Sequence, residues 1–125
     1  MDGRHLEAVV SALWTIRARR MGDEVAYLQP LVAGALNGAR IAYRREVKLG
    51  PGNRVDFLTD AGVAIEVKRG RPRPGALARQ LERYASHDAV SAVVLVLERA
   101  VSLPDTMSGK PIRIVSLRML WGPAV

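Results

Sequence analysis

Residues 92–97, AVVLVL, form an unbroken apolar run of strand length. Successive residues of a β-strand point to opposite faces of its sheet. A strand that is apolar at every position must therefore be covered on both faces, as happens when helices pack on both sides of a sheet. This run predicts a sheet enclosed between helices.

Periodicity and turn residues supply the other elements. We expect helices over 4–20, 23–38 and 75–87, and strands over 41–48, 54–59, 63–69, 92–97 and near 112–120. The order α-α-β-β-β-α-β-β predicts an α/β (α+β) protein with a central mixed β-sheet flanked by helices. With 125 residues the chain is expected to form one domain, in which 1–22 is an N-terminal helical addition to a core of 23–120.

Several protein classes are excluded by composition. The chain has no cysteine, which rules out disulfides, thiol catalysis and cysteine-ligated zinc and is compatible with a cytoplasmic setting. No apolar run approaches the roughly 18 residues of a membrane span, so we expect no membrane partner. Nineteen basic residues against twelve acidic ones give a net charge of +7, which favours an anionic partner such as nucleic acid.

The most informative segment is RVDFLTDAGVAIEVKRG, residues 54–70. A three-residue turn at 60–62, with Gly62 in the left-handed position, predicts a hairpin in which Asp56 lies opposite Glu66. Like charges placed in this way destabilise a hairpin, so the pair calls for a cation. The neighbouring apolar residues are expected to point to the other face, into the core; they are Val55, Phe57, Ile65 and Val67.

Lys68 lies two residues after Glu66 and therefore shares its face. It is one of only three lysines among the nineteen basic residues, so its position next to two carboxylates stands out. Two carboxylates are the hard oxygen ligands that suit Mg²⁺ or Mn²⁺. Such an ion activates water and offsets charge on a phosphate, and Lys68 would add a second cation there.

The helix expected at 75–87 carries one polar residue in its apolar stripe. Leu77, Leu81 and Tyr84 form the stripe, and Gln80 falls within it. A buried amide needs a hydrogen-bond partner. The partner expected for Gln80 is a metal-bound water, an active-site carboxylate or a DNA phosphate.

These residues resemble the motif of the PD-(D/E)XK nuclease superfamily. Asp56 and the run Glu66-Val67-Lys68 match the motif, although Val55 stands where the family usually has proline. Gln80-x-x-x-Tyr84 is similar to the extra motif of its RecB-type exonuclease branch. The resemblance implies a restriction-endonuclease-like fold and Mg²⁺-dependent hydrolysis of DNA that leaves 5′-phosphate ends.

The resemblance also implies a set of catalytic residues. Asp56 and Glu66 would bind the metal, Lys68 would assist at the water and phosphate, and Gln80 and Tyr84 would position the site. Family members also carry a glutamate on the helix before the first strand. Glu24 is the closest match to this third metal ligand, and Glu7 is the alternative.

Nucleic-acid contacts are expected beside this site. The candidates are arginines of the loop after Lys68 and of the following helix, together with Tyr84; the arginines are Arg69, Arg71, Arg73, Arg79 and Arg83. No element for base-specific readout is visible, so little sequence specificity is expected. Glu46 is taken as structural, because pairing across Pro51-Gly52 puts Val47 opposite Asp56, and His5 and His87 have no metal-ligand spacing.

Two other functions stay open at this point. One is a catalytically silent nucleic-acid-binding module that works in a larger complex, and the other is a protein-interaction domain. The sequence also leaves open whether the substrate is duplex, single-stranded or branched DNA or RNA, whether cleavage is internal or from ends, and whether the chain acts as a homodimer.

Overall fold

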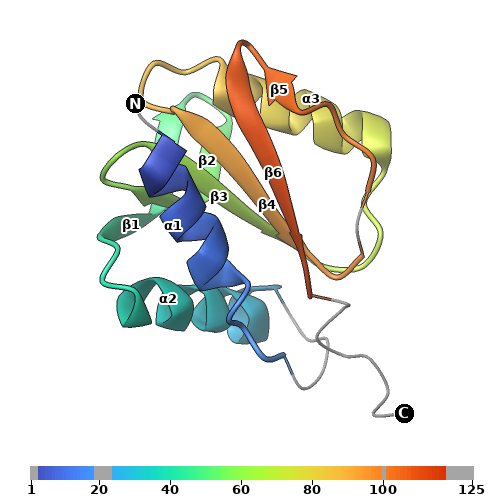
Figure 1. Cartoon of the computed structure of the whole chain (residues 1–125). Helices are drawn as coiled ribbons and strands as arrows, with labels where there is room; N and C mark the ends of the chain where they lie inside the picture. Colours follow the sequence, from blue (N-terminus) through green and yellow to red (C-terminus); the bar gives the residue numbers. More distant parts are fainter. Residues whose placement is uncertain (1–2, 19–23, 100, 118–125) are drawn as a thin grey trace.

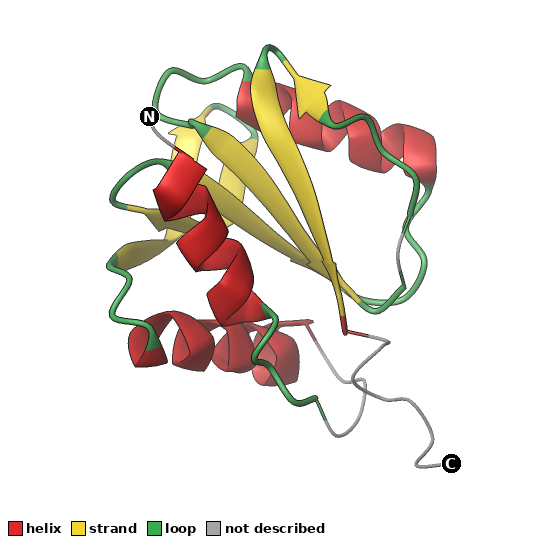
Figure 2. Cartoon of the chain, viewed as in Figure 1, coloured by secondary structure: helices red, strands yellow, loops and turns green. Residues whose placement is uncertain are grey.

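The computed structural model describes residues 3–18, 24–99 and 101–117, except for the side chains of residues 24 and 25. These residues form an α+β fold in which one six-stranded mixed sheet lies between helices (Figure 1). Figure 2 shows helices on both sides of the sheet. The central prediction from residues 92–97 is therefore confirmed.

The sheet has the strand order β1-β2-β3-β4-β6-β5. Its first half is an antiparallel meander, and β3, β4 and β6 are parallel to one another. The short β5 pairs antiparallel with β6 at the far edge. The strands are β1 (Tyr43–Gly50), β2 (Asn53–Thr59), β3 (Val63–Lys68), β4 (Ala92–Leu97), β5 (Thr106–Met107) and β6 (Lys110–Ser116).

Helices α1 (Gly3–Leu13) and α2 (Gln29–Gly38) pack on one side of the sheet, and α3 (Pro74–Ala85) packs on the other. A short π-helical segment, η1 (Glu24–Leu28), leads directly into α2. Pro30 sits in the first turn of α2, where its missing N–H costs no hydrogen bond. Helix α1 shares its core with α2, because Leu6, Val9 and Leu13 join the same apolar cluster as Val32 and Leu36.

Strand β4 divides the apolar interior into two clusters. Ala92, Val94 and Val96 face α1 and α2, whereas Val93, Leu95 and Leu97 face α3. All six residues are buried. We call the two faces of the sheet the α1/α2 side and the α3 side.

The first helix is shorter than the expected 4–20, because α1 ends at Leu13. The Thr15 hydroxyl donates to the Ala12 carbonyl at 2.6 Å, and Arg17 donates to the carbonyls of residues 14–16. Side chains that bond to nearby carbonyls compete with helical hydrogen bonds and end the helix. The first residue of the helix expected at 23–38, Asp23, lies outside the described residues. The last strand ends at Ser116 and not near residue 120, and β5 was not predicted.

No helix in the described ranges is long and apolar enough to cross a membrane.

Candidate active site

The hairpin formed by β2 and β3 has the predicted register. Phe57 pairs with Ile65 and Leu58 with Ala64, which places Asp56 opposite Glu66. The Gly62 N–H donates to the Thr59 carbonyl at 2.9 Å, and Gly62 has a φ of 92°. A left-handed glycine of this kind closes a three-residue turn without steric cost.

The regular backbone pairing of β2 and β3 stops at the two carboxylates. Asp56 Oδ2 accepts a hydrogen bond from the Val67 N–H at 2.8 Å, and Glu66 Oε1 accepts one from the Asp56 N–H at 3.3 Å. Each carboxylate thus takes a backbone donor of the opposite strand in place of a backbone carbonyl. The two side chains are held next to each other at the point where the strands separate.

The second oxygen of Glu66 lies on the α3 side among three polar groups. Its Oε2 is 3.3 Å from Lys68 Nζ and 3.4 Å from both Gln80 Nε2 and the Tyr84 hydroxyl. Lys68 therefore shares the face of Glu66, as its spacing predicts. The carboxylate of Glu66 is also the partner that Gln80 was expected to need.

Glu66 is a costly residue in this position. Burial first, and then the negative charge of Asp56, raise the pKa of its carboxyl to about 7, against the opposing effect of Lys68. Only 5% of the residue is exposed. Lys68 by itself therefore does not compensate the burial of Glu66 beside a second carboxylate, and an added cation would stabilise the ionised forms of both.

Tyr84 connects this cluster to the tip of the β1–β2 hairpin. Its hydroxyl donates to the Arg54 carbonyl at 2.9 Å and accepts from Gln80 Nε2 at 3.0 Å. A hydroxyl has one proton, and Tyr84 donates it to the Arg54 carbonyl, which is closer than Glu66 Oε2. Glu66 Oε2, at 3.4 Å, therefore lies near the hydroxyl without receiving its proton. Burial and the charge of Glu66 raise the pKa of the Tyr84 phenol, so it stays protonated and can keep donating to Arg54. This places Tyr84 among the site residues by contact with Glu66.

The β1–β2 hairpin differs from the prediction. Val47 pairs with Val55 and Arg45 with Phe57, so Glu46, and not Val47, lies opposite Asp56. The turn at Pro51-Gly52 pairs Gly50 with Asn53 as expected, but a bulge between Lys48 and Gly50 adds a residue to β1 and shifts the register. The prediction that Val47 lies opposite Asp56 was therefore wrong, and Glu46 takes that position.

The face of the sheet predicted for the Val55 side chain was also wrong. Phe57, Ile65 and Val67 belong to the α1/α2 side, whereas Val55 packs on the α3 side with Leu81.

The described residues show neither of the two candidates for a third metal ligand, Glu24 and Glu7, in contact with Asp56 or Glu66. Glu24 begins η1, which lies beside β3, but its side chain is outside the described residues. Glu7 pairs with Arg113 of β6 at 2.7 Å, two strands away from β3. Within the described parts of the chain no group of three or more His, Asp or Glu side chains has the arrangement of a metal site. The described donor set is therefore the pair Asp56 and Glu66.

The two histidines form hydrogen bonds between separate elements of the fold. His5 bonds to the Thr59 hydroxyl at 2.9 Å and ties α1 to β2, and His87 bonds to Asn53 at 3.2 Å at the hairpin tip.

A basic groove of about 270 Å³ opens beside the carboxylates. Lys68, Arg73 and Arg83 line it together with Gln80. Arg69 and Arg71 are exposed on the loop that borders it. A phosphate in this groove would meet three cations.

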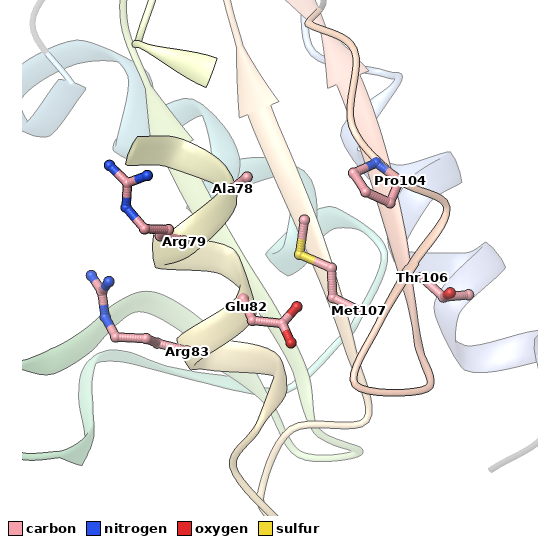
Figure 3. A pocket seen from close by; sticks show the side chains of 7 residues that line it. All are labelled: Ala78, Arg79, Glu82, Arg83, Pro104, Thr106 and Met107. Atoms are coloured by element: carbon pink, nitrogen blue, oxygen red, sulfur yellow. The ribbon is translucent and has the colours of Figure 1, made fainter. Parts of the chain in front are cut away.

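A second pocket of about 540 Å³ lies between α3 and residues 104–107, and none of Asp56, Glu66 and Lys68 lines it (Figure 3). In this view Arg79 and Arg83 extend side by side from one flank of α3, while Glu82 points toward Met107. Both arginines are exposed, and their spacing of one helical turn suits two adjacent phosphates of a backbone.

Glu98 is a residue at this site that the sequence did not indicate. It follows β4, and its Oε2 accepts a hydrogen bond from the Gly70 N–H at 3.0 Å. The loop that carries Arg69, Arg71 and Arg73 is thus attached to the end of β4, the strand next to β3. The one available signal was the position of Glu98 directly after a parallel strand adjacent to β3, since the ends of such strands meet at one edge of the sheet.

Comparison of the chain with protein-family models, with curated proteins and with solved structures found no match.

Proposed function

We propose that this chain is a Mg²⁺- or Mn²⁺-dependent nuclease that hydrolyses phosphodiester bonds of DNA with little sequence specificity. The observation that carries the proposal is the paired arrangement of Asp56 and Glu66, each bonded to the backbone of the other's strand, with Lys68 on the same face. The proposal includes the restriction-endonuclease-like fold and membership of the PD-(D/E)XK superfamily, which the motif residues suggest.

The donor set fits the proposed metal. Asp56 and Glu66 offer only carboxylate oxygens, and Mg²⁺ is commonly held in proteins by one or two carboxylates plus water and substrate phosphate. The raised pKa of Glu66 means that a bound cation would replace a proton there. A bound ion would supply Lewis acidity, which lowers the pKa of water and offsets charge on the phosphate.

The protein's own groups have distinct tasks in this proposal. Lys68 Nζ, 3.3 Å from Glu66, holds a positive charge where the scissile phosphate would lie. Gln80 would fix the position of Glu66 by donating to Oε2, and Tyr84 would hold Gln80 in place by accepting from the same amide nitrogen. Arg73 and Arg83 would bind the flanking phosphates in the groove, which supplies affinity without reading the bases.

The decisive assay incubates the protein with single- and double-stranded DNA and Mg²⁺ or Mn²⁺. We expect cleavage that EDTA abolishes and that Asp56→Asn and Lys68→Ala reduce by about a thousandfold, in line with the loss of a metal ligand or a charged transition-state contact. Asp60→Asn is the matched control, since Asp60 lies in the exposed turn of the same hairpin. Cleavage that survives in both site variants would refute the assignment.

The exposed arginines favour one second candidate, a nucleic-acid-binding module without catalysis. Arg71 and Arg73 are exposed at the groove and Arg79 at the second pocket, and they would bind phosphates whether or not the carboxylates act. This function predicts DNA binding that weakens steeply with salt and no cleavage with any metal. The same incubation, followed by a gel-shift titration at two salt concentrations, separates the two functions.

A further inference from the structure

Glu46 has a backbone conformation that is unusual for its place in the fold. Three non-glycine residues in the described ranges have a positive φ, and two of them, Arg40 and Ser108, lie in turns. Glu46 has a φ of 52° within strand β1. A non-glycine residue in the left-handed region is strained and persists where surrounding structure enforces it, which is frequent at functional sites.

The left-handed residue moves the side chains of β1 from one face of the sheet to the other. Arg45 lies on the α1/α2 side, where its guanidinium is 5.0 Å from the centre of the Phe57 ring and donates to Gln29 at 2.6 Å. Val47, two residues later, packs on the α3 side. In a regular strand residues two apart share a face, so the exchange of faces takes place at Glu46.

Strand β2 changes faces at the residue opposite Glu46. Phe57 faces the α1/α2 side and Val55 the α3 side, and Asp56 lies between them. The ladder keeps its register across this pair, since Arg45 pairs with Phe57 and Val47 with Val55. Both strands therefore rotate together at the pair Glu46 and Asp56, and the hairpin tip lies over α3.

This rotation frees the Asp56 side chain from the ordinary alternation of β2. Its Oδ2 bonds to the Val67 N–H at 2.8 Å, beside Glu66, and does not follow the direction that a regular strand would give it. The Glu46 side chain itself is exposed.

We propose that Glu46 is a positioning residue for Asp56, and that it acts through its left-handed backbone and not through its carboxylate. The metal-binding consequence rests on the proposed function, whereas the placement of Asp56 against Val67 does not. A residue that cannot adopt positive φ would favour a regular β1, and the Asp56 side chain would then stand out from the sheet and lose its bond to the Val67 N–H.

The experiment compares variants that differ in their tolerance of positive φ. Glu46→Gly and Glu46→Asn keep the conformation accessible, whereas Glu46→Val, with a β-branched side chain, disfavours it. Glu46→Ala, which disfavours it less strongly, replaces the valine variant if that variant does not fold. Arg44→Val is the control, because Arg44 is exposed on the same strand and is not among the residues with positive φ.

Two measurements are made on each variant. The first is the NMR signal and hydrogen exchange of the Val67 amide, which reports its bond to Asp56 with no reference to activity. The second is the affinity for Mn²⁺ and, where DNA is cleaved, kcat and KM. For Glu46→Val we expect a shifted, faster-exchanging Val67 amide, Mn²⁺ binding at least tenfold weaker and kcat about a hundredfold lower with KM nearly unchanged, the size of a misplaced group. In Glu46→Gly and Glu46→Asn, the Val67 amide, the Mn²⁺ affinity and kcat should all stay close to those of the wild type.

The outcomes separate this inference from the proposed function. If the wild type neither binds Mn²⁺ nor cleaves DNA, the proposed function fails and the Val67 amide alone decides the role of Glu46. A Val67 amide unchanged in Glu46→Val overturns the inference. Loss of Mn²⁺ binding in the glycine and asparagine variants also overturns it, because the carboxylate of Glu46 would then be what acts.

Discussion

Two hairpins of the sheet share strand β2 but are held by different interactions. The β2–β3 hairpin is closed within its own turn, in which Thr59 accepts the Gly62 N–H through its carbonyl and the Val63 N–H through its hydroxyl. Ser91 also donates to the carbonyls of residues 61 and 62 of this turn. The β1–β2 hairpin has its tip fixed from outside, by bonds from Tyr84 and Arg83 of α3 to Arg54 and Asn53. One hairpin has local hydrogen bonds that close its turn, whereas the tip of the other is held by side chains of a helix distant in the sequence.

This difference bears on how the candidate site is built. The local hairpin brings Asp56 and Glu66 together in spite of their repulsion, and the remote one rotates Asp56 and closes the site with Tyr84. Substitutions in the two hairpins should therefore have different signatures.

The largest expected effect concerns the repulsive pair in the β2–β3 hairpin. The pKa of Glu66 is about 7 in the folded chain against 4.5 for the unconstrained group. The folded state thus binds more protons than the unfolded state in this range, and the stability that protonation of Glu66 provides is lost as pH rises from 4.5 through 7. The loss is about 3 kcal/mol.

Glu66→Gln should remove this pH dependence. Without divalent metal, denaturant unfolding at pH 5 and pH 8 should show the variant gaining stability relative to the wild type as pH rises. Millimolar Mg²⁺ at pH 8 should narrow that gap, because an ion bound only to the folded wild type stabilises it. If the free energy of unfolding changed equally with pH in the two proteins, burial beside Asp56 would not be raising the pKa of Glu66.

The two turn glycines give the next largest effect and a matched pair. A Cβ on Gly62 would lie 2.8 Å from the Ala89 carbonyl oxygen, whereas a Cβ on Gly52 would meet nothing within 4 Å. Both residues have positive φ. We expect Gly62→Ala to cost about 2 kcal/mol and Gly52→Ala about 1 kcal/mol, the second from backbone conformation alone. Equal losses in thermal unfolding would show that the Ala89 contact relaxes at no cost.

Tyr84→Phe tests the remote attachment of the β1–β2 hairpin. It removes the donor to the Arg54 carbonyl and should destabilise the protein by about 1 kcal/mol. Hydrogen exchange should quicken at the hairpin tip near residues 47–55 and stay unchanged at the β2–β3 turn. Equal acceleration in both hairpins would show that the tip does not depend on α3 separately.

The smallest effect is expected for Asn53→Ala. Asn53 accepts from Arg83 Nε at 3.2 Å and contacts His87 Nε2 at 3.2 Å, both near the surface. Its loss should cost about half a kcal/mol by chemical denaturation, since partly exposed hydrogen bonds contribute little. A cost above that of Tyr84→Phe would reverse the order of importance at the tip.

The parts of the fold that could be predicted from the sequence are those with local causes. The register of β2 and β3 follows from the turn at Gly62 and from alternating apolar residues, and both are visible in a few adjacent letters. The covered sheet follows from β4 alone. The contact of Gln80 with Glu66 could be expected because a polar residue in an apolar stripe requires a partner.

The parts that could not be predicted depend on distant contacts. The bulge before Gly50 and the position of Val55 depend on the packing of the hairpin tip against α3, where Gly50 lies close to His87. Nothing in the run Arg-Arg-Glu-Val marks Glu46 as left-handed, because glutamate has no preference for that region. The early end of α1 depends on side-chain bonds of Thr15 and Arg17 that periodicity does not register.

The conformation of Glu46 has a consequence for self-association. Strand β1 forms one edge of the sheet, and an exposed, regular edge strand offers its backbone groups as a template on which a further chain can pair and aggregate. The reversal at Glu46 divides that template into two short pieces, and the exposed charges of Arg44 and Lys48 lie on either side of it. The left-handed backbone of Glu46 thus also interrupts the edge of the sheet at which a further strand could be added.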